Sequence, residues 1–317
     1  GLNRVRYDDV LAEAYPVTST DNARFFFPVY GSSTVSVTNM HSLPQLRLIP
    51  ALGITFAQIL NLNGLWTYYM GRLFNFACFA ALAYFAVKIT PVGKLAFMIL
   101  SLLPMTLHMA SSYSSDAVII GLAFLFASLC FKCIYSKTAI ESKTLIGICV
   151  VMLLLAPCKV IYGLLSLLVL AIPAGKFKNR HISMLFKIGV PIIAAASVAI
   201  FSIASILTIV NPSSNTVGSA SLSAGTVEYY SLTDFIHAPL HTLLVYANTL
   251  FVYGDFYLST FVGGSLSWFQ TELIAPWSLV FAYLLLLFVS SQGTRIDNVT
   301  ISLKQKIGFA LIAVLVF

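Results

Sequence analysis

The chain has 317 residues, of which 59% are hydrophobic and only 9% are charged, and its formal net charge is +7. A soluble domain carries roughly 25% charged residues, so this composition excludes a water-soluble globular protein and indicates an all-α, polytopic integral membrane protein. The positive charge does not require nucleic acid as a partner, because Lys and Arg accumulate in the cytoplasmic loops of membrane proteins.

The polar N-terminal residues 1–47 are predicted to form an outer loop region, and residues 48–317 are predicted to form the transmembrane domain. No hydrophobic segment or signal peptide precedes the loop, and the last apolar run, Ile307–Phe317, stops part-way through a membrane helix. We therefore expect a fragment truncated at both ends. Leu48–Leu60 is apolar but too short to cross about 30 Å of hydrocarbon, so an interfacial or re-entrant helix is expected there.

Longer apolar runs follow in order and are predicted to be membrane helices: Leu65–Val87, Lys94–Met109, Ala117–Ile134, Ile188–Val210 and Leu273–Ser290. Leu145–Ile172 would be about 42 Å long as one helix, which is too long for a single crossing. Pro157 interrupts helical hydrogen bonding near its middle. We therefore predict two short helices that meet at residues 156–159.

Two segments, 211–234 and 254–272, are predicted to be outer loops, and Phe235–Tyr253 between them is predicted to be a re-entrant or interfacial helix. If Leu65–Val87 runs from outside to inside, most of the 18 basic residues fall in inner loops and most of the acidic residues fall outside. This asymmetry follows the positive-inside rule. It predicts that the working face is the outer one.

The same topology places Arg72, Asn75, His108, Asp116 and Lys159 in the outer half of the membrane, although they come from separate helices and turns. Ionisable groups at this depth are costly and usually functional, and Arg with Lys suits a phosphate or diphosphate head group. A structural alternative stays open for each residue. The two cations could anchor in the head groups, Asp116 could cap the helix that follows it, and His108 could be a packing residue.

No metal site is predicted. His237 and His241 are one helical turn apart but have no nearby third ligand, so an interfacial role is expected. Cys130 and Cys133 form a CxxC without a second pair, and buried small side chains are the simpler interpretation. The sequence also has none of the motifs of soluble hydrolases, P-loop proteins or dinucleotide-binding enzymes.

Several motifs resemble the bacterial predicted membrane proteins catalogued as domain of unknown function 2142. They are GRLFN at residues 71–75, LPMTLHMASSYSSDA at 103–117, APCKVIYGLL at 156–165, and two motifs within 234–277. The Ser-x-Ser-x-Asp turn of Ser112, Ser114 and Asp116 is the most specific of them, whereas the family usually has Gln near the position of His108. The family in turn is similar to membrane glycosyltransferases of the GT-C fold.

The resemblance implies a GT-C-like enzyme of the bacterial cytoplasmic membrane with an extracytoplasmic active face. It would transfer a sugar from a polyprenyl-phosphate-linked donor to a glycan or lipid acceptor of the cell envelope. A loop acid would act as a base or metal-linked acid, which leaves a divalent cation open as a cofactor. The catalytic candidates are Asp8, Asp9 and Asp116, and the candidates for substrate binding are Arg72, Asn75, His108, Ser112, Ser114, Lys159 and Tyr162.

The family's acidic motif just after its first membrane helix is not visible in this sequence, and Asp8 and Asp9 are acids of the loop that remains. Two other functions stay open. One is a transporter or flippase for a lipid-linked saccharide, in which the same cations would bind a phosphate that moves across the membrane. The other is a non-catalytic subunit of a membrane assembly. Membrane lipids are expected as surroundings in every case.

Overall fold

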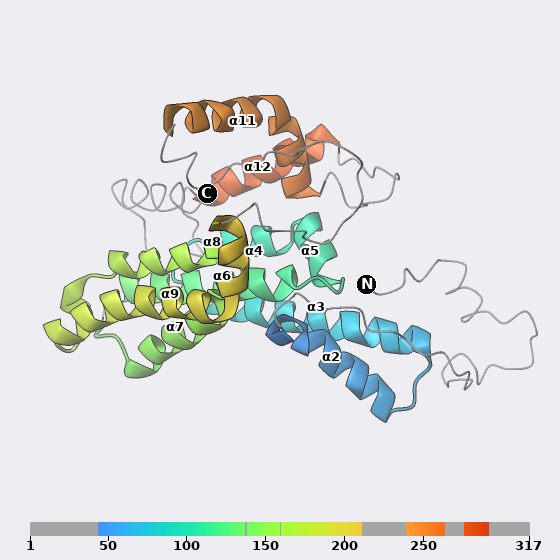
Figure 1. Ribbon diagram of the computed structural model, residues 1–317, viewed down its shortest axis with the longest axis horizontal. Coiled ribbons are helices and arrows are strands. Elements are labelled where there is room, and N and C mark those ends of the chain that lie inside the picture. Colours follow the sequence, from blue (N-terminus) through green and yellow to red (C-terminus); the bar gives the residue numbers. More distant parts are fainter. Residues whose placement is uncertain (1–43, 137, 159, 211–238, 264–275, 292–317) are drawn as a thin grey trace, which may run out of the picture. The chain divides into compact units, whose positions relative to one another are not determined.

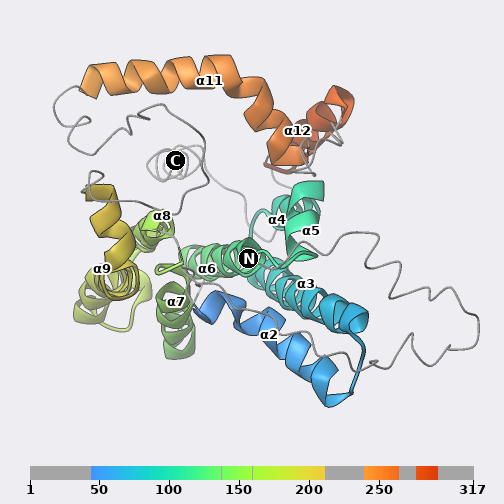
Figure 2. The ribbon, with the colours of Figure 1, turned by 45° about the vertical axis from the view of Figure 1, so that its right-hand side comes forward.

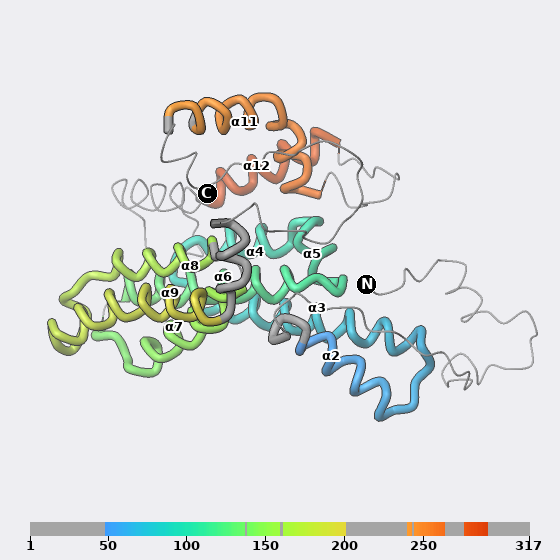
Figure 3. Tube along the Cα trace, in the orientation of Figure 1, coloured from blue at the N-terminus to red at the C-terminus, as the bar shows by residue number. Residues whose placement is uncertain are grey.

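The computed structural model of the chain describes residues 44–136, 138–158, 160–210, 239–263 and 276–291 (Figures 1 and 3). Every regular element in these ranges is a helix. Three of these helices are long and apolar enough to cross a membrane: Gly64–Ile89, Asp116–Tyr135 and Arg180–Ile200. The predicted all-α membrane fold is therefore confirmed.

The chain divides into two compact units. Unit 1 is Gly1–Tyr135 with Gly293–Thr300, and unit 2 is Ser136–Gln292 with Ile301–Phe317. The helices of unit 1 are α2 (Pro44–Ile59), α3 (Gly64–Ile89), α4 (Lys94–Ser101), α5 (Pro104–Ala110) and α6 (Asp116–Tyr135). Those of unit 2 are α7 (Ser142–Leu155), α8 (Val160–Gly163), η2 (Leu164–Ala171), η3 (Ala174–Lys176), α9 (Arg180–Val210), α11 (Pro239–Val262) and α12 (Trp277–Ser291).

Helix α3 is the centre of unit 1, because α2 lies along it and α6 packs against it (Figures 1 and 2). Its start is fixed by Asn63, whose side-chain oxygen accepts a hydrogen bond of 3.0 Å from the Trp66 backbone N–H. That cap satisfies one of the donors that a helix leaves free at its first turn. The helix ends at Ile89, just before Thr90 and Pro91, and its 26 residues span about 39 Å, enough to cross a bilayer.

Small residues let the helices of unit 1 approach closely. A Cβ placed on Gly53 of α2 would lie 2.5 Å from the carbonyl oxygen of Met70 in α3. Phe79 and Ala83 of α3 meet Ala110 and Ala117 in a buried apolar cluster that joins α3 to α5 and α6. Close contact between backbones is the usual way to stabilise helix pairs in a membrane, where the hydrophobic effect between helices is absent.

The predicted continuous helix over Lys94–Met109 is wrong, because the chain breaks between α4 and α5. Pro104 starts α5, and Leu103 before it is extended, with φ −57° and ψ 136°. Proline has no N–H to donate to the preceding turn and disfavours helical geometry in the residue before it. The apolar run continues through the break, which is why its hydropathy did not reveal it.

In unit 2, the predicted break at Pro157 is confirmed: α7 ends at Leu155, and the chain turns over Ala156–Cys158. The second half differs from the prediction, because most of it, η2, is a 3₁₀ helix. Helix α9 packs against α7, α8, η2 and η3. The side-chain ammonium of Lys187 in α9 donates a hydrogen bond of 3.1 Å to the carbonyl of Leu170 near the end of η2.

Helices α11 and α12 contact each other. Helix α11 runs through Gly254 to Val262, so the first part of the predicted loop 254–272 is helical and that prediction is wrong there. The polar and glycine residues suggested a loop, but a single glycine costs a helix only about 1 kcal/mol, and the apolar residues that follow it continue the helix. Residues 264–272, like the predicted loop 211–234, lie outside the described residues.

Candidate functional site

The turn between α5 and α6 is folded by its own serine side chains. The Ser112 hydroxyl donates to the carbonyl of Met109 at 2.8 Å and accepts from the Ser114 N–H at 3.1 Å. The Ser114 hydroxyl accepts from the Asp116 N–H at 3.1 Å and donates to the Asp116 carboxylate oxygen Oδ2 at 3.2 Å. These bonds hold the half-buried carboxylate of Asp116 in the first turn of α6, where the helix dipole favours negative charge.

Side chains of α3 bind this turn through its backbone. The Nε–H of Arg72 donates to the Ser111 carbonyl. The side-chain amide of Asn75 donates to two further carbonyls, those of Ser112 at 2.8 Å and Ser114 at 3.0 Å. Asn75 is fully buried, so both bonds form away from water. The two α3 residues are three positions apart and thus share one face of the helix.

Tyr113 connects the turn to α3 in the opposite sense, because here a side chain of the turn donates to the backbone of the helix. Its hydroxyl donates a hydrogen bond of 2.7 Å to the carbonyl of Tyr68, one turn before Arg72 on α3. Its ring lies over Gly71, where a Cβ would come within 2.7 Å of the ring carbon Cε1. Burial, together with the nearby Tyr68, raises the pKa of the Tyr113 phenol, although Arg72 acts in the opposite direction. The phenol is therefore kept in the neutral form that can donate.

We expect Tyr113→Phe to lower the free energy of unfolding by about 1 kcal/mol, the usual net value of one hydrogen bond. The ring would keep its place over Gly71, so the fold should persist. Thermal unfolding in detergent would measure the change. Tyr84→Phe, at an exposed tyrosine of α3, is the matched control and should have no effect. An equal loss in both variants would contradict the assigned role of the Tyr113 hydroxyl.

The guanidinium of Arg72 makes one hydrogen bond, through Nε, to the turn. Its carbon Cζ lies 5.5 Å from the ring centre of Tyr68 and 5.8 Å from that of Tyr69, within cation–π range. Among the described residues, these rings and the Ser111 carbonyl are its hydrogen-bond and ring partners. The Nε–H is occupied, while the two Nη groups keep their N–H donors. This geometry suits an anion, which a guanidinium binds through two parallel N–H groups.

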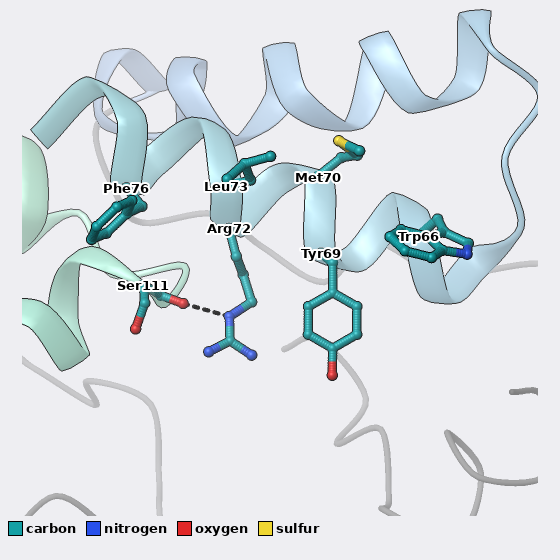
Figure 4. Close-up of a pocket in the computed structure, with 7 residues that line it drawn as sticks. All are labelled: Trp66, Tyr69, Met70, Arg72, Leu73, Phe76 and Ser111. Atoms are coloured by element: carbon teal, nitrogen blue, oxygen red, sulfur yellow. Dashed lines mark hydrogen bonds between the residues drawn. The ribbon is translucent and has the colours of Figure 1, made fainter. Parts of the chain in front are cut away.

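A groove of about 480 Å³ runs along α3 at this arginine. Figure 4 shows the side chains of Arg72 and Tyr69 extending side by side from the helix, with the bond from Arg72 to Ser111. The other residues that line the groove are Trp66, Met70, Leu73, Phe76 and Ser111. An apolar groove with one fixed cation is suited to a ligand that has both an anionic centre and hydrocarbon.

The structure brings together five of the predicted site residues: Arg72, Asn75, Ser112, Ser114 and Asp116. The side chain of His108 is exposed on α5, and its carbonyl accepts from the Ser111 hydroxyl at 3.1 Å.

Asp8, Asp9 and Lys159 lie outside the described residues. Tyr162 is in α8 of unit 2, whereas Arg72 is in unit 1. A pocket shared by Arg72 and Lys159 therefore stays a prediction.

Sequence reasoning missed the roles of Tyr68, Gly71 and Tyr113. The available signal was the spacing of Tyr68, Arg72 and Asn75, which are four and three residues apart and lie on one helical face. Within the described ranges, no three His, Cys, Asp or Glu side chains are placed to bind a metal ion.

Comparison with curated proteins and with solved structures gave no significant match. A family model described as "Predicted membrane protein (DUF2142)" matches residues 30–317, which include all of the described helices and the serine turn with its α3 partners. The apolar helices that could cross a membrane agree with that description. The chain belongs to the DUF2142 family of predicted membrane proteins.

Proposed function

We propose that the protein is a membrane glycosyltransferase of the GT-C type. It transfers a sugar from a polyprenyl-phosphate-linked donor to a glycan or lipid acceptor of the cell envelope, at the extracytoplasmic face of the cytoplasmic membrane. One observation carries the proposal. The guanidinium of Arg72 lines an apolar groove and is hydrogen-bonded to the serine turn, and the same turn orients the carboxylate of Asp116. This reaction needs a phosphate site and a base, and the serine turn holds a candidate for each.

In the proposed reaction, Arg72 binds the phosphate of the donor through its Nη groups. The bond between the sugar's anomeric carbon and the phosphate oxygen breaks, and both bonding electrons go to the phosphate. A cation already held in place stabilises that charge without reorganising as it develops. Because Nε is bonded to Ser111, the guanidinium faces the groove before the donor arrives. Lys159 is proposed as a second cation for the same phosphate.

Asp116 is the proposed general base. Its carboxylate removes the proton from the acceptor hydroxyl while the acceptor oxygen forms a bond with the anomeric carbon. The hydrogen bond from Ser114 to Oδ2 fixes the orientation of the carboxylate. Ser112 holds Ser114 in turn, so in this proposal both serines position the base.

The test is transfer of a radiolabelled sugar from a polyprenyl-phosphate donor by the full-length protein in detergent. We expect Asp116→Asn and Arg72→Lys each to lower the transfer rate about 10²–10³-fold, the usual effect of removing one stabilising or proton-transferring group. Lysine keeps the charge of Arg72 but cannot both bind Ser111 and present a two-pronged edge to the phosphate. The control is Arg180→Lys, an exposed cation of unit 2, which should retain full activity.

Activity close to wild type in both site variants, with unchanged thermal unfolding, would remove these residues from the mechanism. Movement of the labelled lipid between leaflets of vesicles, without sugar transfer, would support the transporter instead. The same two variants would then be expected to slow that movement.

A further inference from the structure

The first turn of α9 has backbone N–H groups without a partner among the described residues. The first bond of this helix runs from the Ser183 N–H to the carbonyl of Asn179, at 3.1 Å, which makes Asn179 the N-cap residue. The N–H groups of residues 180–182 donate no hydrogen bond to any described residue, and the exposed side chain of Asn179 does not cap them. Three such donors, at the positive end of the helix dipole, can bind an anion.

The side chain of Ser183 is a second, independent sign of a ligand at this turn. Ser183 is only 1% exposed, and its hydroxyl has no hydrogen-bond partner among the described residues. A buried hydroxyl without a partner is rare, because leaving it unpaired costs stability. Side chains of an α-helix lean towards its N-terminus and cover the preceding turn. The hydroxyl is thus directed towards the turn that carries the three open N–H groups.

Exposed lysines lie around this helix end. The Ile140 N–H donates a hydrogen bond of 3.0 Å to the carbonyl of Lys176, which joins the segment before α7 to the segment before α9. The two helices also pack against each other, so they begin at the same end of unit 2. Lys143 and Lys178 are exposed there and form no ion pair with a described residue. Glu141 is the only acid in the sequence from 138 to 183, so the local charge is positive.

The surface that follows these cations is hydrocarbon. Helix α9 is long and apolar enough to cross a membrane from its first residue, so its start lies at a membrane surface. Within its next two turns, Met184 is 64% exposed, Leu185 is 75% exposed and Ile188 is 48% exposed. On α7, Ile146 follows Lys143 by three residues on the same face and is 62% exposed. An anion at this end of unit 2 therefore has apolar surface beside it, which suits a lipid better than a free ion.

We propose that the start of α9 binds the phosphate of an anionic phospholipid. The phosphate oxygens accept from the N–H groups of residues 180–182 and from the Ser183 hydroxyl, Lys143 and Lys178 attract the negative charge, and the acyl chains lie along Met184 and Leu185. The positive-inside rule predicts that this end faces the cytoplasm, so the lipid belongs to the inner leaflet. The site lies in unit 2 and does not depend on the proposed sugar transfer.

The test is native mass spectrometry of the purified full-length protein in detergent, titrated with phosphatidylglycerol or with phosphatidylcholine. We expect phosphatidylglycerol to bind at least tenfold more tightly. Asn179→Asp should lower its affinity at least tenfold, because the helix dipole draws the new carboxylate to the open N–H groups, where it repels the phosphate. The same carboxylate suits a helix start, so the thermal midpoint should not fall. Ala139→Asp, which adds the same charge to the exposed segment before α7, is the matched control and should lower the affinity less than threefold.

A second pair of variants tests the lysines. Lys143→Gln with Lys178→Gln should lower the affinity for phosphatidylglycerol about 25-fold, because each lysine near an anionic lipid surface contributes about fivefold. Lys88→Gln with Lys132→Gln removes two exposed lysines from α3 and α6 and should change the affinity less than threefold. Ser183→Ala should weaken binding about fivefold without lowering the thermal midpoint, because its hydroxyl has no partner among the described residues to lose.

Three results would each overturn the lipid site. One is equal affinity for the two lipids. Another is an equal loss in Asn179→Asp and Ala139→Asp, or in the two double glutamine variants, which would mean that only the total charge matters. The third is displacement of phosphatidylglycerol by millimolar inorganic phosphate, which would assign the helix end to a free anion.

Discussion

Replacing Asn75 by aspartate is expected to destabilise the protein by about 3–5 kcal/mol, the range for a buried charge without a partner. The Asn75 amide donates to the carbonyls of Ser112 and Ser114, whereas an aspartate at this position would direct a carboxylate oxygen at them. The remaining amide oxygen, Oδ1, is buried and accepts no hydrogen bond from the described residues. No rotation of the new carboxylate therefore satisfies both carbonyls.

The same substitution at Asn63 is the comparison, because the amide oxygen of that residue accepts a hydrogen bond at the start of α3. Asn63 is also buried, at 2% exposed, but its oxygen accepts from the Trp66 N–H at the start of α3. Aspartate accepts equally well there and suits the positive end of the helix dipole. Asn63→Asp keeps this accepting oxygen and should therefore cost less stability than Asn75→Asp.

Unfolding in mixed detergent micelles, with increasing sodium dodecyl sulfate, would measure both variants. Equal stability of the two aspartate variants at neutral pH would show that Asn75 does not hold the turn.

Gly53→Ala is expected to cost about 1–3 kcal/mol, the range for overpacking a tight interface. The added Cβ would lie 2.5 Å from the Met70 carbonyl oxygen and 2.9 Å from Gly71 Cα. Both atoms belong to the backbone of α3, so no side-chain rotation relieves the clash and the two helices must separate. Because Met70 and Gly71 adjoin Arg72, we also expect weaker lipid binding at the groove.

Gly189→Ala in α9 is the matched control for this substitution. Among the described residues, no heavy atom other than the backbone of the helix itself lies within 4 Å of the Cβ that it would add. Alanine is also the better helix former, by up to about 1 kcal/mol. Thermal unfolding in detergent should therefore show a lower midpoint for Gly53→Ala and an unchanged or higher midpoint for Gly189→Ala. A stable Gly53→Ala variant would mean that the contact between α2 and α3 can relax.

Long apolar runs with clear ends were predictable from the sequence. The predicted helices at 65–87 and 117–134 match α3 and α6 closely, because the adjacent residues Asn63, Pro91 and Asp116 mark their ends. The break at Pro157 was predictable for the same reason. The break before Pro104 was missed because apolar residues continue on both sides of it, so hydropathy alone gives no signal there.

The grouping of Arg72 and Asn75 with the serine turn was also predictable, from membrane depth and residue chemistry. What the sequence did not reveal is that both side chains bind backbone carbonyls of the turn. The sequence tells which side chains are present, but the direction in which a backbone carbonyl points depends on the conformation of the turn. That the Nε of Arg72 binds the turn, while its two Nη groups have no hydrogen-bond partner among the described residues, could therefore be found only in three dimensions.

The 3₁₀ geometry of η2 makes this segment longer than an α-helix of the same residues would be. A 3₁₀ helix rises about 2.0 Å per residue, against about 1.5 Å for an α-helix. The eight residues of η2 therefore extend about 16 Å instead of about 12 Å. Rewinding this segment into an α-helix would draw Leu170 back by several ångströms and break its bond with Lys187. The hydrogen bond from Lys187 is therefore made to the longer, 3₁₀ form of this segment.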